Sequence, residues 1–158
     1  MSPGATDERL LQRAIELARR SREHGNHPFG SLLTDAGSNV VLEAENTVVT
    51  GHDVTGHAEL NLVRAASGQF DAEALGSHTL YTSTEPCAMC AGAIYWSGIG
   101  RVVFALSSAT FQRKIDPEGA AGLALSCRDV FARGGRTVEV AGPFAEDLAW
   151  DVHEAFWR

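Results

Sequence analysis

The sequence has 158 residues, of which 44% are hydrophobic and 21% charged, a length and mixture that fit one globular domain. No apolar run approaches the roughly 20 residues that a membrane-spanning helix needs, so we expect a soluble protein without a membrane partner. The 13 basic and 20 acidic residues give a net charge of −7, which disfavours a broad surface for nucleic acid.

The N-terminal sequence lacks the order of a basic segment followed by an apolar one that marks a secretory signal. It also carries acidic residues that transit peptides usually lack, so we expect a cytoplasmic protein. The chain has three cysteines, an odd number. In a cytoplasmic protein they favour metal-binding, catalytic or buried thiols over disulfides.

The first half of the chain predicts a helix, a hairpin and a second helix. Apolar residues at helical spacing predict a helix from Thr6 to about Glu23. Residues 29–34 and 40–49 have the pattern of two strands joined by a turn. After a loop, the second helix begins at or near His57 and ends near residues 67–68.

The second half alternates strands and helices. In chain order we expect a strand over 78–82, a helix from 87 to about 97, a strand over 101–106, a short helix around 127–133, a strand over 138–140 and a helical tail over 144–157. Pro86 suits the first position of the 87–97 helix. This order predicts an α/β protein with three α/β/α layers around a sheet whose later strands are parallel, in a single domain over residues 1–158.

Two cysteines, Cys87 and Cys90, stand three residues apart in the segment STEPCAMC. On a helix their sulfurs project from one face of the first turn, where the helix dipole favours the thiolate. A thioredoxin-like redox pair would need nothing more. A zinc site would need another ligand, and His57 at the start of another helix offers one. Two thiolates and one imidazole leave a fourth tetrahedral position for water, as in a catalytic zinc site.

Glu59 follows His57 by two residues, in the first turn of the same predicted helix. A carboxylate there can take a proton from a zinc-bound water and pass it to a leaving nitrogen. In a closed structural zinc site, or if the thiols were buried without metal, Glu59 would have no chemical role. The order H-x-E followed about 27 residues later by P-C-x-x-C is the signature of zinc deaminases that act on cytosine or adenine rings.

The sequence thus resembles the cytidine deaminase-like superfamily over roughly residues 5–110. The segments HPFGSLL, AENTVV, HAEL, TLYTSTEPCAMCAGAIYW and GRVVFA are similar to the branch of guanine deaminases, fungal-type cytosine deaminases and tRNA-editing adenosine deaminases. The resemblance implies a five-stranded mixed sheet, one Zn²⁺ per chain at His57, Cys87 and Cys90, Glu59 as proton shuttle, and a homodimer.

The resemblance also implies how a base is held. The Cys87 backbone amide would steady the reacting oxygen, Asn46 and the Ala58 amide would hold the base, and Phe29 would stack on it. Of the histidines other than His57, His153 alone is a candidate to face the site.

The motif barely constrains the ring. The acidic and aromatic tail FAEDLAWDVHEAFWR suits a cover over a small substrate better than a grip on RNA. A guanine-like ring presents N–H donors, and Glu154, Asp151 and Asp116 are the candidate acceptors, in that order. We therefore expect guanine or a related aminopurine first, cytosine second and tRNA adenosine third. A non-enzymatic partner subunit of an editing complex is the remaining alternative, although it would not need Glu59.

Overall fold

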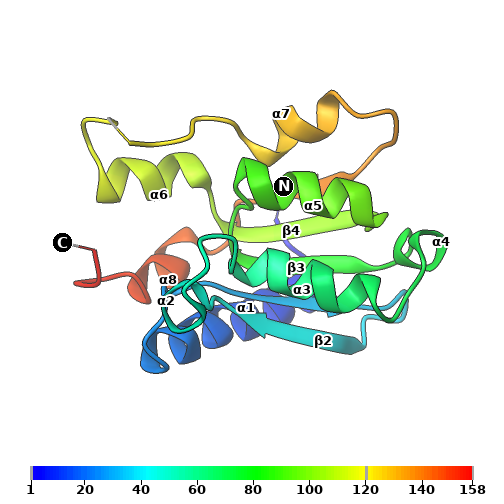
Figure 1. Cartoon of the computed structure of the whole chain (residues 1–158), viewed down its shortest axis with the longest axis horizontal. Helices are drawn as coiled ribbons and strands as arrows, with labels where there is room; N and C mark the ends of the chain where they lie inside the picture. Colours follow the sequence, from blue (N-terminus) through cyan, green and yellow to red (C-terminus); the bar gives the residue numbers. More distant parts are fainter. Residues whose placement is uncertain (1, 120, 158) are drawn as a thin grey trace.

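The computed structural model describes residues 2–119 and 121–157 (Figure 1). The strands are β1 (Gly30–Thr34), β2 (Val40–Glu45), β3 (Thr79–Thr84), β4 (Arg101–Leu106) and β5 (Glu139–Ala141). The helices are α1 (Ala5–Glu23), α2 (Val48–Gly51), α3 (Ala58–Ser67), α4 (Ala72–Leu75), α5 (Ala88–Ser97), α6 (Ser108–Ile115), α7 (Cys127–Ala132) and α8 (Glu146–Asp151).

The five strands form one mixed sheet in the order β2-β1-β3-β4-β5. β1 pairs antiparallel with both β2 and β3, whereas β3, β4 and β5 run parallel to one another. The predicted hairpin and the predicted parallel strands are therefore confirmed. Parallel strands need crossover connections, which α5 provides between β3 and β4.

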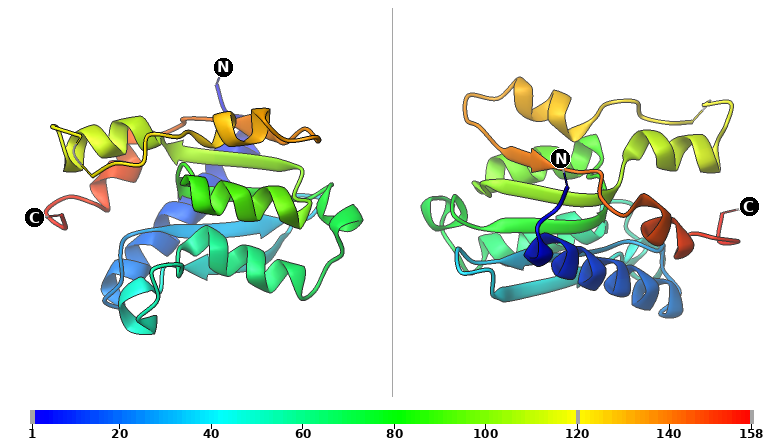
Figure 2. Two further views of the ribbon diagram at one scale, coloured as in Figure 1. Left: turned by 45° about the horizontal axis from the view of Figure 1, so that its top comes forward. Right: turned by 180° about the vertical axis from the view of Figure 1, so that it is seen from behind.

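Helices cover both faces of the sheet, as predicted (Figure 2). α1 and α8 lie on one face, where the apolar side of α1 packs on β1, β3 and β4. α3, α5 and α7 lie on the other face, against the opposite side chains of the same strands. β4 is fully buried from Val102 to Leu106, as expected for a strand covered on both faces. The site lies where α3 and α5 begin, next to the carboxyl end of the central strand β3.

The prediction for the second strand was wrong at its end. β2 stops at Glu45 rather than Val49, and residues Val48–Gly51 form the single helical turn α2. The side chains of two asparagines explain the difference. Oδ1 of Asn46 accepts the first N–H of that turn at 3.0 Å, and Oδ1 of Asn26 accepts the next two. These donors are then not available to a strand.

Three other predictions need correction. α5 begins at Ala88 with Cys87 as its N-cap, so Pro86 precedes the helix instead of opening it. The tail is helical only over α8, because turns follow from Val152. α4 and α6 were not predicted, and both begin at a capping side chain, Asp71 and Ser107 respectively.

Within residues 2–119 and 121–157, no helix combines the length and apolar character that crossing a membrane requires.

Candidate metal centre and its cavity

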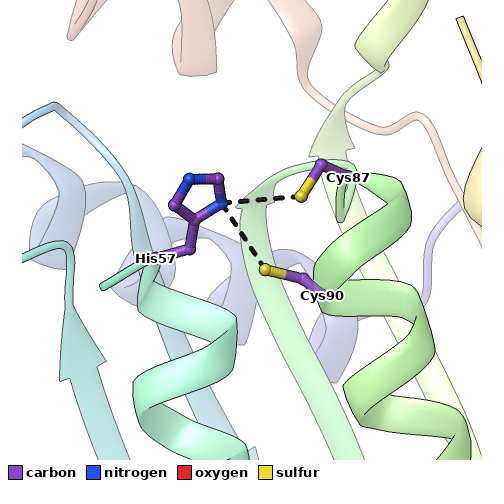
Figure 3. Close-up of side chains that lie close together, drawn as sticks. All are labelled: His57, Cys87 and Cys90. Carbon is purple, nitrogen blue, oxygen red and sulfur yellow. Dashed lines mark hydrogen bonds between the residues drawn. The ribbon is translucent and has the colours of Figure 1, made fainter. Parts of the chain in front are cut away.

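The starts of α3 and α5 bring three candidate ligands together. His57 is the N-cap of α3 and Cys87 the N-cap of α5, and both have extended backbone dihedral angles. Cys90 lies one turn into α5. Figure 3 shows the two sulfurs and one ring nitrogen converging from the two helices on one point. The sequence prediction that these residues meet is confirmed.

The distances fit tetrahedral zinc. Nδ1 of His57 lies 3.5 Å from Sγ of Cys87 and 3.5 Å from Sγ of Cys90. Zinc with a sulfur at about 2.3 Å and a nitrogen at about 2.0–2.1 Å, at tetrahedral angles, would hold the two donors about 3.6 Å apart. All three ligand atoms lie within 4.8 Å of one another. Three protein ligands leave one coordination position for water or substrate.

Before a metal binds, the site favours the deprotonated form of one of its three ligands. Hydrogen bonding from Cys90 and His57 lowers the pKa of the Cys87 thiol to about 4, against the opposing effect of burial. The neighbouring Cys87 sulfur and burial raise the pKa of the Cys90 thiol. The pair thus carries one negative charge by itself. A bound cation would release the second proton, since metal binding deprotonates a coordinating thiol.

Glu59 is buried beside these ligands, with 4% of its surface exposed. Burial raises the pKa of its carboxyl, and a hydrogen bond from the Thr82 hydroxyl at 2.5 Å opposes this effect. The charge on Cys87 also raises the pKa, whereas His57 lowers it. A carboxyl in this environment binds a proton more readily than an exposed one, which suits a group that must take up and return protons.

A cavity of about 420 Å³ opens onto His57, Glu59 and Cys87. Its other lining residues are Phe29, Thr84, Glu85, Ser108, Ala109, Phe111, Gln112, Leu123, Ala124, Leu125, Ser126 and Asp129. No lysine or arginine occurs among these residues, all of which lie in the described part of the chain. The cavity is therefore suited to an uncharged ring and offers no cationic side chain to a phosphate.

The structure places the remaining predicted base-binding residues as follows. Phe29 lines the cavity. Asn46 is buried directly after β2, and its Nδ2 has no hydrogen-bond partner within residues 2–119 and 121–157, but neither Asn46 nor Ala58 is among the residues that line the cavity. Ala58 and Cys87 lie at helix starts, where backbone N–H groups lack a partner within the helix.

The three predicted acids of the C-terminal region do not line the cavity. Asp116 ends α6 and accepts the N–H groups of Gly119 and Ala121. Asp151 borders a separate surface hollow beside α1, and Glu154 is exposed. The turn after α6 holds Asp116, whereas Asp151 and Glu154 lie at the end of the short α8 and in the turns that follow it.

Sequence reasoning missed two other acids of the cavity wall. Asp129 lies in the first turn of α7, where Ser126 caps the helix, and the pattern S-x-x-D could have indicated this start. Glu85 links α6 and α7, which both contribute residues to the cavity wall, by hydrogen bonds. Its Oε2 accepts the N–H and hydroxyl of Ser108, while its Oε1 accepts the N–H of Cys127. No local sequence signal indicates that Glu85 makes these hydrogen bonds.

His153 lies behind the cavity wall. Its ring centroid is 5.2 Å from that of Phe29 and 5.1 Å from that of Phe111, and both phenyl rings line the cavity. Burial lowers the pKa of His153 to about 4, so the imidazole is neutral at pH 7. The tail after α8 thus supports the aromatic wall from outside.

Comparisons with known proteins agree with this site. Residues 5–106 match the family described as the cytidine and deoxycytidylate deaminase zinc-binding region. The chain is 41% identical over 152 residues to a probable cytosine deaminase of Schizosaccharomyces pombe. The aligned residues are 96% of this chain and 92% of the relative.

Two further similarities involve other rings. A tRNA-specific adenosine deaminase of Haemophilus influenzae is 39% identical over 101 residues, which are 64% of this chain and 58% of the relative. The structure of a guanine deaminase from Nitrosomonas europaea aligns with a TM-score of 0.76 at 25% identity, over 96% of this chain and 84% of that one.

Proposed function

This chain belongs to the cytidine and deoxycytidylate deaminase family and is a zinc-dependent deaminase, and from that premise we propose that it hydrolyses the amino group of a small uncharged nucleobase or nucleoside. The observation that carries this proposal is the cavity. It joins His57, Cys87 and Glu59 to walls of apolar, neutral polar and acidic residues, without a lysine or arginine among the described residues that line it. A nucleotide or an RNA would leave phosphates without a cationic partner there.

The chemistry divides between the metal and the protein. When bound, zinc supplies the Lewis acidity that lets water lose a proton near neutral pH. Glu59 accepts that proton and delivers it to a ring nitrogen, and it then carries the second proton of the same water to the departing amine. Water and the aminated ring are thereby converted to a ring carbonyl and ammonia. The position of Cys87 as the N-cap of α5 supports a role for its amide as a donor to the oxygen that becomes the carbonyl.

Two donors support the proposal that hydrogen bonds hold the ring, although neither Asn46 nor Ala58 lines the cavity itself. Asn46 Nδ2 is buried without a partner among the described residues, and the Ala58 N–H lies in the first turn of α3. A buried donor that stays unpaired costs about 1–3 kcal/mol, which a ring carbonyl at this position would offset. Both cytosine and guanine carry such a carbonyl. Phe29 supplies a flat apolar wall for the ring face.

We place cytosine first among the rings, because a probable cytosine deaminase is 41% identical over 96% of the chain, whereas a tRNA-specific adenosine deaminase of Bacillus subtilis is 30% identical over the same share. This reverses the order expected from the sequence. The acids that favoured guanine, Asp116, Asp151 and Glu154, do not line the cavity. An aminopurine remains the second candidate, supported by the Asp129 carboxylate at the cavity wall and by the size of the cavity.

Ammonia release from a substrate panel tests the proposal. The panel comprises cytosine, cytidine, guanine, guanosine, adenine, adenosine, dCMP and a tRNA anticodon stem-loop. We expect turnover of a free base or nucleoside, with cytosine the fastest, and little turnover of dCMP or the stem-loop. Activity confined to the stem-loop or to dCMP would contradict the small-molecule assignment, while a preference for guanine would change only the ring.

We also infer a homodimer. Trp96 and Met89 on α5 are 82% and 37% exposed, and such exposed apolar side chains on one helix support contact with a second copy. Sedimentation equilibrium would measure the mass in solution. The substitution Trp96→Lys should weaken association, and a monomeric mass for the unsubstituted protein would reject the inference.

A further inference from the structure

Two buried hydroxyl groups interrupt the apolar face of the sheet beneath α3. Ser31 on β1 and Thr82 on β3 are directly paired in the antiparallel register, and neither has any exposed surface. Further along the same face, the paired residues are Leu33 and Leu80, which belong to the core between the sheet and α3. Valine would suit the Thr82 position better if packing alone decided it. The hydroxyls therefore need an explanation beyond packing.

The Thr82 hydroxyl connects the sheet to Glu59. Its Oγ1 lies 2.5 Å from Oε1 of Glu59, 3.1 Å from the carbonyl oxygen of Thr84 and 3.4 Å from that of Gly30. A hydroxyl has one proton to donate. Oε1 of Glu59 is the nearest of the three acceptors, so the proton is directed to Glu59.

Ser31 fixes the direction of this bond. The Ser31 hydroxyl donates to Oγ1 of Thr82 at 3.2 Å. An oxygen that already accepts one hydrogen bond has its own proton free for another acceptor, and chained hydroxyls polarise one another. The arrangement is thus a two-step chain from Ser31 through Thr82 to Oε1 of Glu59. The branched Cβ of Thr82 restricts its rotation and keeps the hydroxyl in place.

We propose that Thr82, supported by Ser31, is a positioning residue for the deamination reaction, which holds Oε1 of Glu59 so that Oε2 carries the proton. Oε1 accepts the Thr82 hydrogen bond whether the carboxyl is ionised or protonated on Oε2. Glu59 can then take up and return a proton without turning. This inference rests on the proposed role of Glu59 as the proton shuttle.

The test compares Thr82→Val, which removes only the hydroxyl, with Thr82→Ser, which keeps it. Cytosine is the assay substrate, or guanine if cytosine is not turned over. For Thr82→Val we expect kcat to fall about 10- to 100-fold because the carboxyl is misplaced, with KM within about twofold and zinc content unchanged. Thr82→Ser should recover kcat to within about fivefold of the unsubstituted protein.

Two further variants separate positioning from a structural effect. Ser83 is also buried on β3, but it faces the opposite side of the sheet and accepts the Gly30 N–H. Ser83→Ala is the matched control and should leave kcat within about twofold, because the hydrogen bond of its hydroxyl is to the Gly30 backbone and not to Thr82 or Glu59. Ser31→Ala should lower kcat by less than Thr82→Val, because it removes only the outer link of the chain.

A double variant distinguishes this inference from the role of Glu59 itself. If Thr82 acts through Glu59, Glu59→Gln combined with Thr82→Val should be no slower than Glu59→Gln alone. Independent, multiplicative losses would overturn the inference, as would unchanged kcat in Thr82→Val. Substantial activity in Glu59→Gln would instead reject the proposed shuttle. Should Thr82→Val fail to fold, the kcat values of Thr82→Ser and Ser31→Ala decide, and unchanged kcat in Ser31→Ala would then count against the chain.

Discussion

The indole N–H of Trp157 donates a hydrogen bond to Nδ1 of His153 at 3.1 Å. Because an indole nitrogen can only donate, Nδ1 must accept, and the ring proton lies on Nε2. The imidazole is therefore neutral, enclosed by Phe29, Phe111 and Trp150. This relationship connects the end of the chain to the wall of the cavity.

His153 should make stability sensitive to acid. Its pKa is lowered from 6.5 to about 4 in the folded state, chiefly by burial and further by Arg22. Its stabilising contribution is thus complete above pH 6.5 and is lost as pH falls towards 4, a loss of about 3 kcal/mol. Urea unfolding from pH 7 to 4.5 measures it. His153→Leu should flatten the curve, and an equally steep curve in that variant would assign the effect to other groups.

Glu59→Gln should separate metal binding from turnover. The amide cannot take up a proton from water, so we expect a fall in kcat of at least about 10²- to 10⁴-fold. The metal ligands are untouched, so zinc should remain near one per chain by metal analysis. Glu59→Asp serves as the control that keeps a carboxylate. If Glu59→Gln retained turnover, Glu59 would not be the proton shuttle.

His57→Ala should lose zinc. It removes one of three converging donors, and a bound metal also stabilises the fold, so both zinc content and the unfolding midpoint should fall. Cys127→Ser is a control, because Cys127 is a buried residue of α7 and is not part of the ligand cluster. Full zinc content in His57→Ala would show that the ligand set is different.

Thiol reactivity should distinguish the cysteines after zinc is removed with a chelator. Cys87 has a pKa lowered to about 4 and is half-buried, so it should react with iodoacetamide at pH 6. Burial raises the pKa of Cys127 to about 12, and this thiol should remain unmodified. Mass spectrometry of peptides gives both rates. Zinc should protect Cys87, and faster labelling of Cys127 would contradict the assignment.

The local patterns of the sequence were sufficient for much of the fold and for the metal site. Helical spacing placed α1 and α3, and the β-branched run placed β4. The spacing of His57, Glu59, Cys87 and Cys90 indicated both the metal and its chemistry, because each half of the motif lies at a helix start. Such features depend on a few neighbouring residues, which the sequence displays directly.

The substrate wall could not be predicted in the same way. Asp116, Asp151 and Glu154 were plausible from residue type alone, but the short α8 and the turn at Asp116 direct them elsewhere. Glu85 takes its role from contacts with Ser108 and Cys127, which are distant in the sequence.

The sequence by itself thus determined the family, the metal ligands and the reaction, because a catalytic zinc site needs fixed residue types at helix starts. Only the tertiary structure decided which side chains surround the ring and which hydroxyl holds Glu59. Thr82 reaches Glu59 because the register of β1 and β3 sets it beneath α3. Cross-strand register and long-range packing arise from the whole core, and no short segment encodes them.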